Sequence, residues 1–231
     1  MISLNVEALS ATLFALFSIL FATTFIYTCY RSPWAKLRAS NGLQHLCFGA
    51  GVAVMIIWSI NADIAVGVSI HFLGMTAMTL VLGWDLAIVC ASIVLFLITV
   101  SKAGLAGFES LSYWNNFSAN GVITILLPVL IAQLTVQWAQ RKLPKNFFIY
   151  LFVCGFFCAG LSATLVGAAV SLTLFLSDIH PWFKIQQDVV GIIVLTAFPE
   201  GLLNGMLITA IMVFYPDWIR SFDAKAYIDD Q

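Results

Sequence analysis

Residues 188–215 read DVVGIIVLTAFPEGLLNGMLITAIMVFY, and this stretch decides the class of the protein. It is long and apolar enough to cross a membrane as a helix, and Glu200 is the only ionisable side chain between its two ends. An acidic side chain in the middle of such a helix costs ~2.5 to 3.5 kcal/mol on insertion scales. We therefore expect Glu200 to face a bundle interior, a partner subunit or a water-filled cavity, and to mark a functional site.

The composition of the whole chain places it among integral membrane proteins. Its 231 residues are 61% hydrophobic and 9% charged, with a mean hydropathy of +1.00. A soluble domain carries about 25% charged residues, so this chain has too few to cover a surface in water. We predict an all-α, polytopic membrane helix bundle, a single integral membrane domain over residues 1–231, with about seven transmembrane helices. The predicted spans are 8–30, 43–60, 64–82, 84–100, 118–138, 147–176 and 189–215.

The basic residues predict the orientation of the chain in the membrane. Eight of the ten Lys and Arg residues follow the first span, the fifth span or the last span, and only Lys102 and Lys184 fall on the other side. The side richer in basic residues faces the cytoplasm. We therefore expect the N-terminus outside and the C-terminus inside, as seven spans require. The first basic residue, Arg31, follows the first apolar run, which predicts a retained helix and not a cleaved signal peptide.

Short turns and aromatic loops give further expectations about the arrangement. The turns at residues 61–63 and 83–85 are so short that the spans they join must be antiparallel neighbours. The two longest outer loops, residues 101–117 and 177–188, form either an interfacial aromatic belt or a lid over an outward-facing pocket. Their aromatic residues are Phe108, Tyr113, Trp114, Phe117, Trp182 and Phe183.

Catalytic and nucleotide-binding motifs are absent from the sequence. It contains no GxxxxGK[ST] loop, no HExxH helix and no GxSxG elbow, and its five cysteines form no CxxC pair. We therefore expect no enzymatic activity and no certain cofactor. If the protein takes part in energised transport, another subunit must hydrolyse the ATP.

His71 is the first candidate binding residue. Met75 and Met78 follow it at i+4 and i+7 on one face of the predicted third helix. This pattern is either a surface for a soft metal ion or a core imidazole packed against methionines. We expect His71 to point into a pocket open to the outside, bounded by the third and last spans and the two outer loops. His45 lies near the predicted cytoplasmic side, too far away to share a ligand with His71.

Glu200 and Asn204 are the second candidate group, because they share a helix face at i and i+4. Pro199 precedes the glutamate and should distort the helix, which would free backbone carbonyl groups. A carboxylate on a proline-kinked helix is common in the binding sites of transporters. Gly201 and Gly205 add a GxxxG pair, which serves either internal packing or the docking of a partner subunit. The sequence leaves these uses open.

Several short motifs resemble one family of membrane proteins. Residues 67–74, GVSIHFLG, followed by Gly83 and Trp84, resemble the region of the CbiM/NikM family in which a histidine-bearing helix precedes an LG-x dipeptide. Residues 199–215, which begin PEGL, resemble the family's final helix, which also carries a glutamate. Similarity to a divergent branch of predicted energy-coupling-factor permeases from proteobacteria covers most of the chain. It includes LQHL (43–46), FGA (48–50), TL (79–80), LPKN (143–146), CGFF (154–157) and FD (222–223).

The resemblance implies a function and partners. CbiM/NikM proteins are the membrane substrate-capture components of energy-coupling-factor cobalt and nickel transporters. This chain would then be a substrate-binding (S-type) component in the bacterial inner membrane, with a transition-metal ion as its substrate. Its partners would be membrane lipid, an ATPase and a transmembrane coupling subunit, and no nucleic acid. We expect His71, Glu200 and Asn204 to bind substrate, with His71, Met75 and Met78 as the metal donors.

The N-terminus departs from the family pattern. Family members begin Met-His-Ile, and their terminal amine and histidine form part of the metal site, whereas this chain begins Met1-Ile2-Ser3-Leu4. Only His71 matches a ligand position, and one imidazole cannot hold a four-coordinate ion alone. Either the metal differs, other donors replace the missing ones, or the substrate is not a metal. The departure also leaves open a non-transport role, as a membrane assembly factor or an anchor subunit for another complex.

Overall fold

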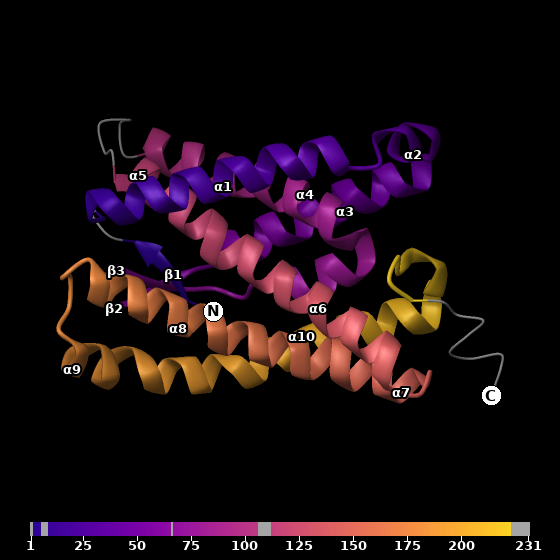
Figure 1. The fold of residues 1–231 in the computed structure, drawn as a ribbon. Helices are drawn as coiled ribbons and strands as arrows, with labels where there is room; N and C mark the ends of the chain where they lie inside the picture. Colours follow the sequence, from indigo (N-terminus) through magenta and orange to yellow (C-terminus); the bar gives the residue numbers. More distant parts are fainter. Residues whose placement is uncertain (1, 6–8, 66, 106–111, 223–231) are drawn as a thin grey trace.

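The computed structural model describes residues 2–5, 9–65, 67–105 and 112–222, which form an elongated helix bundle (Figure 1). Within these residues, six helices are long and apolar enough to cross a membrane. They are Ala11–Arg31, Asn41–Ser59, Met75–Leu105, Tyr113–Lys142, Phe147–Leu176 and Trp182–Phe214. The predicted all-α, polytopic membrane bundle is confirmed.

The α-helices and the short segments that join them account for most of the chain. The α-helices are α1 (Ala11–Arg31), α2 (Trp34–Ala39), α3 (Asn41–Ser59), α4 (Met75–Leu105), α5 (Ser112–Asn120), α6 (Leu127–Lys142), α7 (Phe147–Ile149), α8 (Cys158–Leu176), α9 (Trp182–Ile185) and α10 (Gly191–Phe214). Three π-helical segments join neighbouring α-helices into the last three long spans: η1 (Gly121–Leu126), η2 (Tyr150–Phe157) and η3 (Gln186–Val190). A 3-10 turn, η4 (Pro216–Trp218), follows α10.

The predicted third span, residues 64–82, is wrong in its first half. Two strands, β2 (Ala62–Ala65) and β3 (Gly67–Ile70), occupy this region and form an antiparallel sheet with β1 (Ile2–Asn5), in the order β1-β3-β2. The reason lies in the periodicity, because β-branched residues alternate here with small or polar ones, as in a strand. The alternating residues are Ile64, Val66, Val68 and Ile70. The predicted helix at residues 64–82 relied on their high mean hydropathy, which does not distinguish a strand from a helix.

The chain reverses direction at Gly83, inside the residues that form α4. Gly83 has a φ of 81° and a ψ of 161°, so α4 consists of a short helix over residues 75–82 and a long helix over residues 84–105. His71 and Lys102 line one cavity, although a straight helix would hold them on the order of 40 Å apart. The turn predicted at residues 83–85 is therefore confirmed. We call residues 75–82 the half-helix.

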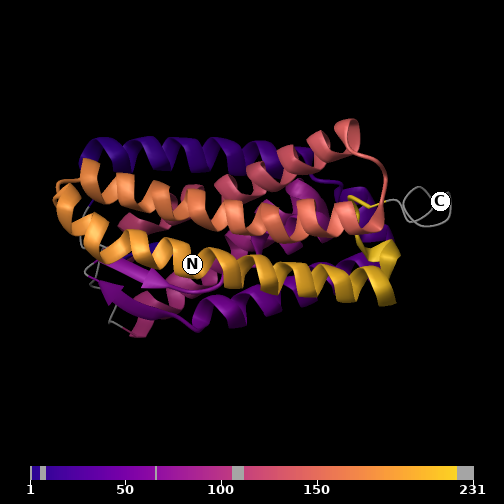
Figure 2. The same ribbon diagram turned by 90° about the horizontal axis from the view of Figure 1, so that it is seen from below.

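The two ends of the bundle differ. The sheet, α5 and α9 lie at one end, whereas α2, α7 and η4 lie at the other (Figures 1 and 2). The backbone N–H of Leu4 in β1 donates to Oδ1 of Asn120 at 2.9 Å, which ties the sheet to α5. Strand β1 and the turn η4 therefore lie at opposite ends, as the predicted orientation needs. Which end faces the cytoplasm stays a prediction.

Both predicted outer loops are partly helical. The long helix of α4 extends to Leu105 and α5 begins at Ser112, while α9 begins at Trp182. The rings of Trp114 and Phe117 pack on Phe96 of α4, with centroids 6.1 and 6.3 Å away. Phe108 lies outside the described residues. These aromatic contacts lie within the protein, and the belt and lid roles stay predictions.

The GxxxG pair on α10 packs inside the bundle. A Cβ added at Gly201 would lie 2.9 Å from the backbone oxygen of Phe156, and one at Gly205 would lie 3.4 Å from the Cβ of the same residue. The missing side chains thus let α10 approach η2 closely. For these two glycines the internal-packing alternative is confirmed.

We expect Gly83→Ala to lower the free energy of unfolding by about 1 to 3 kcal/mol. This combination of positive φ and extended ψ suits glycine almost alone, and an added Cβ would lie 2.7 Å from Nη1 of Arg220. Thermal unfolding of the detergent-solubilised protein measures the change. Gly49→Ala in α3 is the control, because nothing lies within 4 Å of a Cβ added there. Equal melting temperatures for the two variants would show that the reversal does not need glycine.

Candidate functional site

Glu200 and Asn204 of α10 bind the start of the half-helix. Oε2 of Glu200 accepts a hydrogen bond from the backbone N–H of Leu73 at 3.0 Å, and Oε1 accepts one from Gly74 at 2.9 Å. Oδ1 of Asn204 accepts from the backbone N–H of Ala77 at 2.9 Å, and its Nδ2 donates to Oε1 of Glu200 at 2.9 Å. Both side chains are buried, with relative exposures of 2% and 0%.

These contacts form a cap on the half-helix. The first N–H groups of a helix have no partner within it and carry the positive end of its dipole, so a carboxylate is stabilised there. The prediction that Glu200 avoids lipid is confirmed by its burial. The carboxylate holds the backbone of residues 73 and 74, which are two and three positions after His71. Direct contact of Glu200 or Asn204 with a substrate stays a prediction.

The other end of the half-helix is held by the segment that follows α10. The backbone N–H of Arg220 donates to the carbonyl of Val81 at 3.2 Å, and that of Ser221 donates to the carbonyl of Leu80 at 3.3 Å. The hydroxyl of Ser221 adds a bond to the Leu80 carbonyl at 2.8 Å and lies 2.6 Å from the hydroxyl of Tyr150. The last carbonyl groups of a helix lack partners within it, and this segment supplies them.

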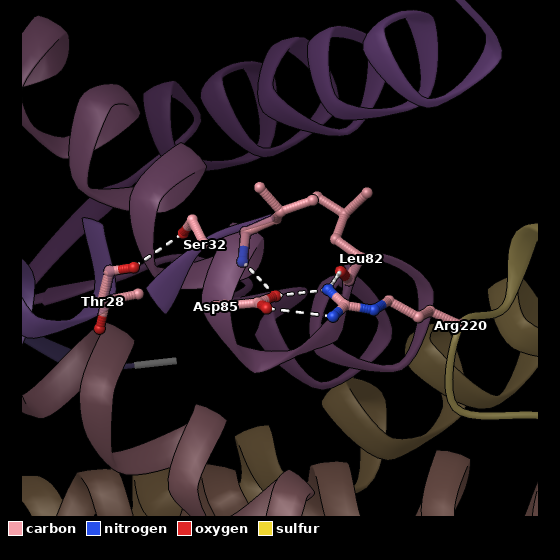
Figure 3. A network of polar contacts seen from close by, with 6 residues as sticks. Thr28, Ser32, Leu82, Asp85 and Arg220 are labelled. Atoms are coloured by element: carbon pink, nitrogen blue, oxygen red, sulfur yellow. Dashed lines mark hydrogen bonds and ion pairs between the residues drawn. The ribbon is translucent and has the colours of Figure 1, made fainter. Parts of the chain in front are cut away.

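An ion pair closes the turn between the two parts of α4 (Figure 3). The guanidinium of Arg220 donates to the carbonyl of Leu82 at 3.0 Å and to the two carboxylate oxygens of Asp85 at 2.5 and 3.1 Å. Asp85 Oδ1 also accepts from the backbone N–H of Leu86 at 2.7 Å, at the start of the long helix. The half-helix is therefore fixed at both ends by α10 and the residues after it.

His71 lines a cavity of about 80 Å³ at the sheet end of the bundle. Its walls come from β1, β3, the end of α3, the long helix of α4, α5 and η1. Its polar side chains include Asn61, His71, Thr99, Lys102, Tyr113 and Asn116. A pocket around His71 is present, but its predicted walls are wrong in two respects, because neither α10 nor the outer loop at residues 177–188 contributes a lining residue. For α10 the reason is that Glu200 and Asn204 turn toward the half-helix.

The hydrogen bonding of His71 fixes its tautomer. Nδ1 lies 3.0 Å from the carbonyl oxygen of Phe72, and a carbonyl can only accept, so Nδ1 carries the proton and Nε2 keeps its lone pair. Burial lowers the pKa of His71 to about 4 despite this bond, which makes the imidazole neutral at pH 7. His71 lies outside the six candidate spans. Metal-ligating histidines usually have this arrangement, in which the second ring nitrogen donates to a carbonyl or carboxylate.

The other predicted metal donors do not join His71 in the cavity. Met75 and Met78 are buried in the hydrophobic core and are not among the lining residues. His45 is exposed near the start of α3, at the opposite end of the bundle from the sheet. Across the described ranges, no group of three or more His, Cys, Asp and Glu side chains is placed to hold a metal ion.

Sequence reasoning missed Lys102 and Trp58 as residues of this site. Lys102 lines the cavity, and Trp58 supports its wall, because Nε1 of Trp58 donates to the carbonyl of Leu73 at 3.0 Å and its ring lies 5.7 Å from that of His71. The sequence showed Lys102 only as a basic residue of an outer loop. No spacing signal links it to His71, because the reversal at Gly83 brings them together.

The fold and the site define a polytopic helical membrane protein with a polar cavity at one end. The family model for the cobalt uptake substrate-specific transmembrane region, CbiM, matches residues 4–218. The chain therefore belongs to the CbiM family, whose members are membrane components of cobalt uptake, and the resemblance noted in its motifs is confirmed. No curated protein and no solved structure matches the chain. A transporter family agrees with the expectation that the protein is not an enzyme.

Proposed function

We propose that the chain is the substrate-binding (S-type) component of an energy-coupling-factor-like transporter and that it captures a transition-metal ion in the His71 cavity. Membership of the CbiM family supports the transport role. The observation that carries the metal assignment is the state of His71. A neutral imidazole whose Nδ1 is held by a carbonyl presents Nε2 as a ligand, which suits cobalt or nickel.

Glu200 and Asn204 support this function indirectly, because they fix the backbone that follows His71 and do not line the cavity themselves. They hold the backbone N–H groups of Leu73, Gly74 and Ala77. The half-helix then connects the cavity to the Asp85–Arg220 pair at the other end of the bundle. A change in the cavity would therefore reach that end through a short helix that is tied at both termini.

The remaining parts of the transporter lie in other subunits. The chain contains no P-loop motif, so an ATPase and a transmembrane coupling subunit would supply and transmit the energy. Eight of the ten basic residues follow the first, fifth and last predicted spans, which favours a cytoplasmic position for the Arg220 end, where such subunits would contact it. We place the protein in the bacterial inner membrane as a multi-pass component.

We expect His71→Ala to weaken the binding of Co²⁺ and Ni²⁺ to the purified protein by at least about a hundredfold, since loss of an outer-shell partner alone costs 10- to 100-fold. Isothermal titration and elemental analysis measure it. His45→Ala, at the exposed start of α3, is the matched control and should bind as the wild type does.

The same preparations test the alternative roles. If the wild-type protein binds neither metal under reducing or non-reducing conditions, the metal assignment fails and His71 is a core residue or a contact to an organic substrate. If an ATPase and a coupling subunit copurify with the protein, the result supports the proposed role as a transporter component. Copurification with the subunits of an unrelated complex instead would favour an assembly factor or anchor.

A further inference from the structure

The long helix of α4 borders two apolar grooves, which residues of the candidate membrane spans form almost entirely. The larger groove measures about 480 Å³ and lies between this helix and α3. The smaller one measures about 310 Å³ and lies between the same helix, α1 and α5. Ile93 lines both grooves, so they meet at this residue. Each groove offers the apolar surroundings in which an acyl chain is favourable.

The larger groove has the length of one leaflet of a membrane. It begins at Leu37 of α2 and follows α3 from Gln44 to Met55, which is about 16 Å along the helix axis at 1.5 Å per residue. One leaflet contributes half of a hydrocarbon core that is about 30 Å thick. Among the described residues that line the groove, Gln44 alone has a nitrogen or oxygen atom in its side chain. The groove therefore matches the acyl layer of the leaflet at the α2 end of the bundle.

A positively charged segment lies where the larger groove begins. From the start of α1 to the end of α3, the chain contains Arg31, Lys36 and Arg38 but no Asp or Glu. Nε2 of Gln44 donates to the carbonyl groups of Leu37 and Arg38, at 2.9 and 3.3 Å. These bonds tie α2 and its cations to the end of the groove.

Two of these three cations are separate from the acidic residue nearest to them. Lys36 lines another cavity, of about 390 Å³, together with Asp217 of η4. Arg31 and Arg38 are exposed and do not line that cavity. Basic residues at the membrane surface attract anionic lipids, and basic pockets beside membrane helices bind their headgroups. Arg31 and Arg38 therefore suit a negatively charged headgroup.

We propose that the two grooves bind one anionic phospholipid from the leaflet at the α2 end of the bundle. One acyl chain occupies each groove, and the phosphate group lies at Arg31 and Arg38. A phospholipid has the two chains that the joined grooves accept and the negative charge that the arginines favour, whereas an apolar helix of a partner protein supplies neither. The inference goes beyond the proposed function and does not depend on metal capture.

The test uses the purified full-length protein, freed of lipid in detergent, and two lipids with the same acyl chains. Native mass spectrometry counts the molecules of phosphatidylglycerol, which is anionic, or phosphatidylethanolamine, which is zwitterionic, that bind to each chain. We expect one phosphatidylglycerol per chain, bound about 20- to 30-fold more tightly than phosphatidylethanolamine, because each of the two arginines contributes about fivefold.

Charge variants test the headgroup. The double variant Arg31→Gln/Arg38→Gln should lose the preference for phosphatidylglycerol. Arg141→Gln is the matched control and should keep it, because it removes an exposed cation from the last turn of α6 at the same end of the bundle.

Gly51→Leu tests the larger groove. Gly51 lines it, and the nearest atom to a Cβ added there is Cγ2 of Val94 at 3.9 Å, so a leucine can take the space of the acyl chain without a clash at its Cβ. We expect phosphatidylglycerol to bind at least tenfold more weakly, since two buried methylene groups alone are worth about that factor. The lipid should raise the melting temperature of the wild type but not of this variant.

Gly49→Leu is the matched control for the groove. Gly49 belongs to the same helix, lines neither groove and has nothing within 4 Å of an added Cβ, so this variant should bind lipid as the wild type does.

Four results would overturn the inference. Equal affinity of the wild type for the two lipids, or an unchanged preference in Arg31→Gln/Arg38→Gln, refutes the headgroup contact. A folded Gly51→Leu variant with wild-type affinity refutes the groove. Dimers that Gly51→Leu disrupts and phosphatidylglycerol does not displace would show that a second copy of the chain covers the grooves instead. Thermal unfolding without lipid verifies that each variant is folded, and if Gly51→Leu is not, the arginine variants decide.

Discussion

Glu200→Ala should lower the free energy of unfolding by about 2 to 6 kcal/mol, the cost of leaving two buried backbone N–H groups without acceptors. Those groups belong to Leu73 and Gly74. The membrane interior offers no water molecules that could accept their hydrogen bonds once the carboxylate is removed. Besides the loss of overall stability, we expect a local loss of structure at the start of the half-helix. In hydrogen exchange, the amides of Leu73, Gly74 and Ala77 should lose their protection first, because the half-helix loses its cap.

Two further variants sharpen this result. Thr196→Ala, also in α10, removes a hydroxyl that donates to the carbonyls of Ile192 and Ile193 in its own helix and should change stability little. Glu200→Gln keeps one oxygen acceptor and the side-chain volume, so it should fold but impair metal binding by letting the loop at His71 shift. A Glu200→Ala protein as stable as Thr196→Ala would show that the cap is dispensable. Wild-type metal affinity in Glu200→Gln would show that Glu200 does not position His71.

The sequence predicted the membrane class and the burial of Glu200 because both depend on average hydropathy and on the cost of a charge in lipid. A long apolar run needs no partner to be recognised, and an isolated carboxylate within it must find a polar contact somewhere. The sequence did not reveal that the polar contact of Glu200 is the N-terminus of the half-helix. Leu73 and Glu200 lie far apart in sequence, and a backbone N–H group leaves no signature in the residue type.

The third span shows where hydropathy misleads. Residues 64–70 are as apolar as a membrane helix, but their alternation of β-branched and small residues is that of a strand, and pairing with β1 decides the outcome. This pairing moves His71 off a helix, so the helical spacing that placed Met75 and Met78 beside it no longer applies. Lys102 entered the site for the same kind of reason, through a chain reversal that a single glycine permits.

Removing the Asp85–Arg220 pair should have the second largest effect on stability. The pair is bidentate, and the side chain of Asp85 is only 6% exposed, whereas that of Arg220 is 45% exposed. Breaking a fully buried pair costs 3 to 5 kcal/mol, and the exposure of the arginine to water reduces this, so we expect Asp85→Ala to cost about 2 to 4 kcal/mol. Part of the loss should come from the unpaired N–H of Leu86.

A double-mutant cycle with Arg220→Ala separates the pair from its surroundings. If the two charges act together, the double variant should be less destabilised than the sum of the single variants, by about 1 to 3 kcal/mol. Arg31→Ala, which removes a cation from the last turn of α1 at the same end of the bundle, is the control and should not couple to Asp85→Ala. Additive effects of Asp85→Ala and Arg220→Ala would mean that the turn is held by the backbone bonds of residues 220 and 221 alone. Coupling between them would instead make this ion pair the point at which a cytoplasmic partner could release the half-helix, and through it the backbone next to His71.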